Sequence, residues 1–242
     1  MLRQLDVIID TAIATNSRMG LFAYVYRRTT AQILKEVELG NFEDNDRMVK
    51  FDVEFANFYL DAYHAYSNGL EVSRSWDFVF KNAKEPLTIL QHVMLGINTH
   101  INLDLAMAVS AVMREKELAE IETDYNTVNR ILSDIVNEIQ DRLGRVSPLL
   151  FMLDWAGKNS DEKIIDFSMA KAREVSWGNA NLLWGLGMEH QEEAIKNIDG
   201  VVLKLSELIK TPQSKIIGFL LSLIGRFEKK NIAKVIATLR ED

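Results

Sequence analysis

The sequence predicts an all-α protein, a single-domain bundle of about eight to ten helices, on two observations. The first is periodicity. Apolar residues recur at intervals of three and four along almost the whole chain, as on one face of an α-helix, and the alternation typical of β-strands is hard to find. The second is the shortage of turn residues, with only 3 prolines and 12 glycines in 242 residues. A β-sandwich or barrel needs many more turns than these can supply.

The first three predicted helices are separated by polar breaks that contain glycine. The first covers residues 2–14 and is followed by "TNSRMG", and the second covers 21–39 and is followed by "GNFEDND". The third covers 45–67 and ends at "SNG", where Gly69 is placed to act as a C-cap. The next segment, "SRSWDFVFKNAKE", predicts a short helix or an irregular connector.

Two long helices are predicted in the middle of the chain. The first begins at Pro86, in a first turn where the missing N–H costs nothing, and continues to about Glu120. The second has Thr123 or Asp124 as its N-cap and Gly144 at its end.

The remaining helices complete the bundle. We expect a short helix in "SPLLFMLDWAG", and then helices over 160–188, 189–210, the segment that "TPQS" opens, and 229–240. No linker or repeat divides the sequence, which predicts one domain over 1–242. The C-terminal helices over 189–240 are expected to pack on the rest.

Charge and composition exclude several classes of protein. A net charge of −7 argues against a nucleic-acid partner. The absence of cysteine excludes disulfides, zinc fingers and thiol nucleophiles. The N-terminal stretch "MLRQLDVIIDTAIATN" lacks the features of a signal peptide, and "IIGFLLSLIG" is too short to span a bilayer. These observations predict a cytoplasmic protein.

The end of the chain is both apolar and basic. Residues 213–240 surround the run "IIGFLLSLIG" with lysine and arginine. Such a segment can lie on a membrane surface or form an oligomer contact. The simpler interpretation, which we favour, is a helical pair that closes the bundle with its basic residues in solvent.

The predicted helix from Pro86 carries an unusual polar stripe. His92, Gly96, His100 and Asp104 are spaced by four, so they follow one face of the helix. His100 and Asp104 have the spacing of two metal ligands on one helix. Gly96 leaves room for a ligand or for another helix. A further polar side chain, Asn98, lies on a different face.

The stripe has a structural explanation as well as a functional one. Polar residues of large helical proteins are often hydrogen-bonded core residues, and this is the more frequent case. In favour of function, two of only four histidines lie within nine residues of each other. Buried polar groups also need partners, and polar networks inside apolar bundles are common at functional sites.

Neighbouring predicted helices offer partners for the stripe. The third helix carries Arg47, Asp52 and Asn57, and the helix after the stripe carries Asp124 and Asn129. For Asp124 the alternative role is the N-cap. These residues complete the predicted pocket.

The pocket supports three hypotheses about function. The first is an enzyme, a hydrolase or lyase acting on a small molecule. In it, His100 and Asp104 bind a divalent metal with Asp52 or Asp124, or form an acid–base pair assisted by His92. The second is a module that binds a small molecule without chemistry, and the third is a purely structural network. Phosphate-loop, dinucleotide-binding, G-x-S-x-G and H-E-x-x-H motifs are absent from the sequence.

Four segments of the chain resemble a known family. These are "FDVEFANFYLDAY", "QHVMLGINTHINLDL", "DYNTVNRIL" and "DFSMAKAREVSWGNANLL", which includes Arg173 and Trp177 as recognisable residues. They resemble the bacterial DUF5995 family, a domain of unknown function, over roughly 40–185. The resemblance implies that the polar stripe and Asp52 belong to the elements that define the family. It implies no particular activity.

Overall fold

All regular structure that the computed structural model describes is helical, over residues 1–150, 152–153 and 169–241. The fold class predicted from the sequence is thus confirmed, with eleven α-helices in these ranges rather than eight to ten. The first six are α1 (Leu2–Thr15), α2 (Met19–Glu38), α3 (Asn45–Ser67), α4 (Arg74–Asn82), α5 (Ile89–Thr99) and α6 (Leu105–Val112). The others are α7 (Glu122–Val146), α9 (Met169–Leu186), α10 (Gln191–Lys210), α11 (Lys215–Phe227) and α12 (Ile232–Arg240).

The long helix predicted from Pro86 differs most from its prediction. It begins at Ile89, because Thr88 and Gln91 form a capping box in which each side chain bonds to the other's backbone. A π-helical turn over His100–Asp104 then separates α5 from α6. The α6 helix ends at Val112, before the predicted end.

Two further boundaries correct the prediction. Asp124 lies inside the first turn of α7 and is not its N-cap, because the helix begins at Glu122. Gly144 also lies inside α7, which ends at Val146. The helix predicted over 160–188 is described from Met169 onward, as α9. Its earlier part, and most of the short helix predicted in "SPLLFMLDWAG", lie outside the described residues.

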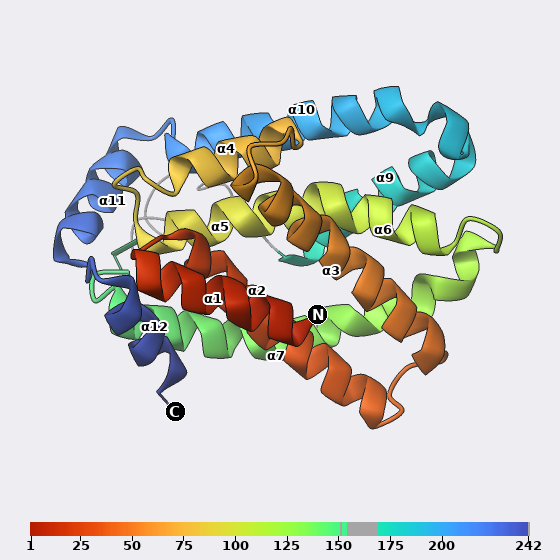
Figure 1. The fold of residues 1–242 in the computed structure, drawn as a ribbon, viewed down its shortest axis with the longest axis horizontal. Coiled ribbons are helices and arrows are strands. Elements are labelled where there is room, and N and C mark those ends of the chain that lie inside the picture. The colour runs from red at the N-terminus through yellow and green to blue at the C-terminus, as the bar shows by residue number, and fades with distance from the viewer. Residues whose placement is uncertain (151, 154–168, 242) are drawn as a thin grey trace.

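The α5 helix, the π turn and α6 form the centre of the bundle. Figure 1 shows them running in sequence through the middle of the molecule, with α10 on one side and α1, α2 and α7 on the other. The α10 helix packs on α4 and α5, and α12 packs on α1, α2 and α7. Described helices from both halves of the chain, among them α2, α3, α9 and α10, therefore pack on α5 or the π turn that carry the polar stripe.

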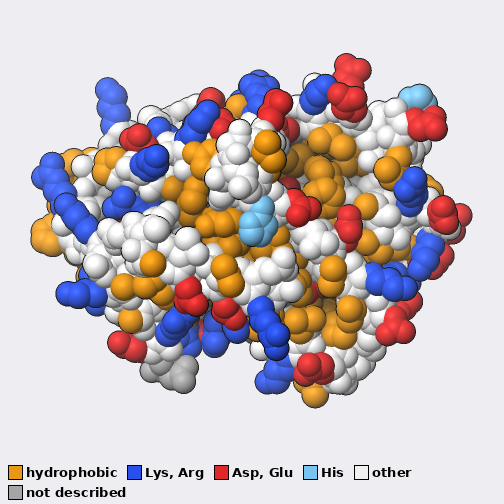
Figure 2. All heavy atoms as spheres, in the orientation of Figure 1, with side chains coloured by type: hydrophobic (Ala, Val, Ile, Leu, Met, Phe, Trp, Pro, Cys, Tyr) orange, Lys and Arg blue, Asp and Glu red, His pale blue; other side chains and the backbone are white. Residues whose placement is uncertain are grey.

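Outer surfaces carry both charge and apolar residues. Acidic and basic side chains are interspersed on the face shown in Figure 2, with apolar side chains between them. On α11, Ile216, Phe219 and Phe227 are exposed, so the membrane or oligomer contact considered for residues 213–240 stays a prediction. Within the described ranges, the helices are too short or too polar to cross a membrane.

Candidate functional site

The π turn brings His100 and Asp104 into direct contact. Nδ1 of His100 lies 2.8 Å from Oδ2 of Asp104, and both side chains are almost completely buried. A π turn holds more residues than a turn of α-helix, so the side chains that follow it face other directions than an unbroken α-helix would give. On α4, Trp76 donates from Nε1 to both carboxylate oxygens of Asp104, at 3.2 and 3.1 Å.

Aromatic side chains surround the His100 imidazole. The Phe55 ring stacks on it with a centroid distance of 3.8 Å and an interplanar angle of 10°. The Tyr26 ring meets it edge to face at 4.3 Å. Phe22 also packs nearby, because Gly96 has no side chain: a Cβ at Gly96 would lie 2.3 Å from Cγ of Phe22. Gly96 thus allows α2 to approach α5 closely and does not itself line a space for a ligand.

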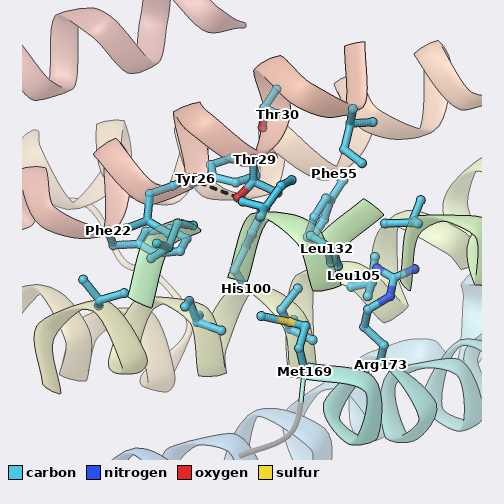
Figure 3. A pocket seen from close by; sticks show the side chains of 18 of the residues that line it. Phe22, Tyr26, Thr29, Thr30, Phe55, His100, Leu105, Leu132, Met169 and Arg173 are labelled. Carbon is cyan, nitrogen blue, oxygen red and sulfur yellow. Dashed lines mark hydrogen bonds between the residues drawn. The ribbon is translucent and has the colours of Figure 1, made fainter. Parts of the chain in front are cut away.

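A partly open cavity of about 210 Å³ lies beside the imidazole. Its walls come from α2, α3, α5, the π turn, α6, α7 and α9, and they are mostly apolar, with Val93, Ile97, Val128 and Leu132 among them. His100 lies between these walls in Figure 3, together with residues from α2 and α3 above it and α9 below.

Four polar atoms of the lining residues make no hydrogen bond of normal geometry within the described part of the chain, although the Tyr26 and Thr30 hydroxyls lie near each other. They are Oη of Tyr26, Oγ1 of Thr30, Oδ2 of Asp52 and Nε2 of His100, all buried. A buried polar atom without a partner is uncommon in folded proteins, because water is lost and nothing replaces it. Four such atoms around one cavity distinguish this region from an ordinary core.

Burial controls the charge of these groups. It raises the pKa of Asp52 to about 7 and lowers the pKa of His100 well below its usual value. Burial also raises the pKa of Asp104, an effect that the hydrogen bond from Trp76 opposes. His100 is therefore a neutral imidazole at pH 7, and Asp52 gains or loses its proton near neutral pH.

Two other polar residues predicted on the same helix, Asn98 and His92, do not line the cavity. Asn98 donates from Nδ2 to the Val202 carbonyl and to the Ser206 hydroxyl, and so joins α5 to α10. His92 is buried but does not line the cavity. Burial lowers its pKa to about 3. In the described structure neither residue can act on a molecule held beside His100.

Two further predicted pocket residues form a separate ion pair. Nη2 of Arg47 lies 2.8 Å from Oδ2 of Asp124, and both residues are buried. The Asp124 carboxylate also accepts from the backbone N–H groups of Glu43 and Asp44, which fixes the entry to α3. This pair is structural, and neither residue lines the cavity.

The residues predicted as metal ligands are not brought together. Asp124 is engaged by Arg47, while Nδ1 of His100 is engaged by Asp104. Among the residues that the structure describes, no group of three or more histidine, aspartate and glutamate side chains could hold a metal ion. Metal binding by His100 and Asp104 with Asp52 or Asp124 therefore stays a prediction.

The prediction for Asn57 is also corrected, and other cavity residues were not predicted. Asn57 is exposed on α3, since the helix turns its Phe55 and Tyr59 faces inward instead. Asn129 is half-buried and accepts a hydrogen bond from Arg173, which lines the cavity from α9. Sequence reasoning missed Tyr26, Thr30 and Arg173 as cavity residues, because no local spacing connects α2 and α9 with the polar stripe.

Comparison with known proteins identifies one match. A family model described as "Family of unknown function (DUF5995)" matches residues 1–212. The resemblance found in the sequence is confirmed, and the match extends well beyond 40–185 at both ends. Neither the curated proteins nor the solved structures contain a match.

Proposed function

The chain belongs to the DUF5995 family of unknown function, and from the geometry of its cavity we propose that it binds a small, mainly apolar molecule that carries a hydrogen-bonding group. The observation that supports this proposal is the set of four unpartnered polar atoms around one apolar cavity. Each such atom costs roughly 1–3 kcal/mol while it lacks a partner. A ligand hydroxyl or carbonyl would provide one.

The size of the cavity limits the ligand. An engineered apolar cavity of about 150 Å³ holds benzene, and this cavity is larger, at about 210 Å³. It therefore suits a molecule of roughly seven to ten non-hydrogen atoms. The apolar walls favour a molecule of this kind over water.

Titration calorimetry with 1-octanol tests the binding function. We expect saturable binding at one site of the wild-type protein. Val128→Phe fills the cavity from α7 and should weaken binding at least tenfold, whereas Val175→Phe, at an exposed position of α9, should bind as the wild type does. Absence of binding, or equal binding by the wild type and Val128→Phe, would rule the proposal out.

Acid–base catalysis in the same cavity is the second candidate. When Asp104 accepts from Nδ1–H of His100, Nε2 carries a lone pair that can take a proton from a bound molecule. Asp52, with a pKa of about 7, supplies a second group that exchanges protons near neutral pH. These two groups line one cavity, and this observation favours the candidate.

An ester substrate distinguishes catalysis from binding alone. Hydrolysis of phenyl acetate, which is within the size limit of the cavity, should be faster with the wild-type protein than in buffer. It should fall about 100-fold or more in Asp104→Asn and in His100→Gln, as expected for loss of a general base. Equal rates in all three proteins would exclude catalysis of this reaction by His100 and leave the binding function.

A further inference from the structure

Arg173 is a buried cation on the wall of the cavity. It lies on α9, is 2% exposed, and is the only lysine or arginine among the described residues that line the cavity. Its side chain extends from α9 toward the cavity in Figure 3, apart from Tyr26 and Thr30. An arginine keeps its positive charge in proteins, so burial here leaves a charge that needs compensation.

Neutral groups form the surroundings of this guanidinium. Nε donates to Oδ1 of Asn129 and Nη2 donates to the Tyr125 carbonyl, both at 2.6 Å. The Tyr125 ring lies beneath the guanidinium at 4.1 Å. None of the carboxylates in the described part of the chain pairs with Arg173. Burial lowers its pKa, and only Tyr125 opposes that effect.

A second buried arginine, Arg47, differs from Arg173 because it has a carboxylate partner. It is 7% exposed and pairs directly with the Asp124 carboxylate. Burying an ion without a counter-ion costs several kcal/mol, and the pairing of Arg47 avoids this. Arg173 is more deeply buried and lacks such a carboxylate among the described residues. Nη1 of Arg173 also makes no hydrogen bond to any described residue.

We propose that the ligand of this cavity is a small apolar monocarboxylate, whose carboxylate binds Arg173 while its apolar body lies between α2, α5 and α7. The inference rests on the proposed binding function and adds the charge of the ligand to it. Charge-assisted hydrogen bonds from arginine to a carboxylate are among the stronger polar contacts in proteins.

One cation in a mostly apolar cavity favours a singly charged ligand. A phosphate monoester carries close to two negative charges and three acceptor oxygens, and the described lining offers one basic side chain for them. His100 adds no positive charge, because burial lowers its pKa well below 6.5. A carboxylate carries a single negative charge, which matches the single positive charge of Arg173, and it needs fewer hydrogen-bond donors than a phosphate does.

Three ligands of one chain length test the inference on the wild-type protein by titration calorimetry. These are octanoate, 1-octanol and octylammonium. We expect octanoate to bind about tenfold or more tightly than 1-octanol, and octylammonium to bind most weakly. If 1-octanol binds as tightly as octanoate, or octylammonium binds best, the carboxylate inference is overturned while the binding function stands. If none of the three ligands binds, the carboxylate inference and the proposed binding function are both overturned.

Substitutions locate the effect at Arg173. In Arg173→Met, octanoate should lose its advantage over 1-octanol, and in Arg173→Lys most of the advantage should remain. Arg145→Met removes an exposed arginine of α7 and should bind all three ligands as the wild type does. A preference for octanoate that survives in folded Arg173→Met would overturn the assignment. If Arg173→Met does not fold, the order of the three ligands on the wild type decides.

Discussion

At the scale of single residues, the cavity polar atoms differ from the hydrogen-bonded polar groups of the core. Tyr125 donates its hydroxyl to the Arg173 carbonyl at 2.6 Å, whereas the hydroxyls of Tyr26 and Thr30 lie near each other but make no hydrogen bond of normal geometry in the described structure. Removing a partnered group leaves its partner unsatisfied, but removing an unpartnered group relieves a penalty. The two kinds of residue should therefore respond in opposite ways to the loss of a hydroxyl.

Thr30→Val tests this difference directly. The substitution nearly preserves shape and removes an unpartnered hydroxyl, so the free energy of unfolding should stay equal or rise by up to about 1 kcal/mol. Tyr125→Phe, the matched control, should lower it by about 1–3 kcal/mol. Urea denaturation measures both. A loss of stability in Thr30→Val as large as in Tyr125→Phe would show that the Thr30 hydroxyl has a structural partner.

Asp52 should make stability depend on pH. Its pKa is about 7 in the folded protein and about 3.9 in an unfolded chain, so the folded state holds the proton more tightly. The contribution of Asp52 is fully present below pH 4 and decreases as the pH rises to about 7, by an amount on the order of 4 kcal/mol. In Asp52→Asn this decrease should be absent.

Unfolding free energies at pH 5 and pH 8 measure the effect of Asp52. The decrease between these pH values should be smaller in Asp52→Asn than in the wild type. Asp61→Asn, at an exposed position of α3, should behave as the wild type does. Equal pH dependence in Asp52→Asn and the wild type would mean that Asp52 does not keep its proton in the cavity.

At the scale of elements, two features position the imidazole of His100. One is the close contact between α2 and α5, and the other is the π turn. The four-residue spacing predicted that His100 and Asp104 share a face, and the structure shows them in contact. The spacing could not predict the π turn, which depends on how neighbouring helices pack around it. For the same reason His92 and Asn98, which appear close to His100 in the sequence, serve other contacts.

Gly96→Ala should separate the two helices. The added Cβ would overlap Phe22, so we expect a loss of about 1–3 kcal/mol in unfolding free energy and weaker binding of 1-octanol. Gly144→Ala, at an open position of α7, should instead stabilise the protein by about 0.5–1 kcal/mol. Thermal and urea denaturation report both changes. A Gly96→Ala protein as stable as the wild type would contradict the close approach.

At the scale of the whole molecule, the cavity collects side chains from distant parts of the chain. The helical fold class and the contact between His100 and Asp104 could be predicted, because both follow from local spacing. The rest of the cavity could not, because Tyr26, Thr30 and Arg173 become its walls only through the packing of α2, α7 and α9. The contact of Asp124 with Arg47 could not be predicted for the same reason, and metal binding stays a prediction.

The ¹⁵N resonances of the histidine imidazoles test most directly whether the unpartnered polar atoms receive a ligand. We expect Nε2 of His100 to be unprotonated at pH 7 and to shift when 1-octanol is added. His92, buried outside the cavity lining, provides the internal control and should not shift. A His100 resonance that stays unchanged at saturating 1-octanol, or that moves no more than that of His92, would contradict the account.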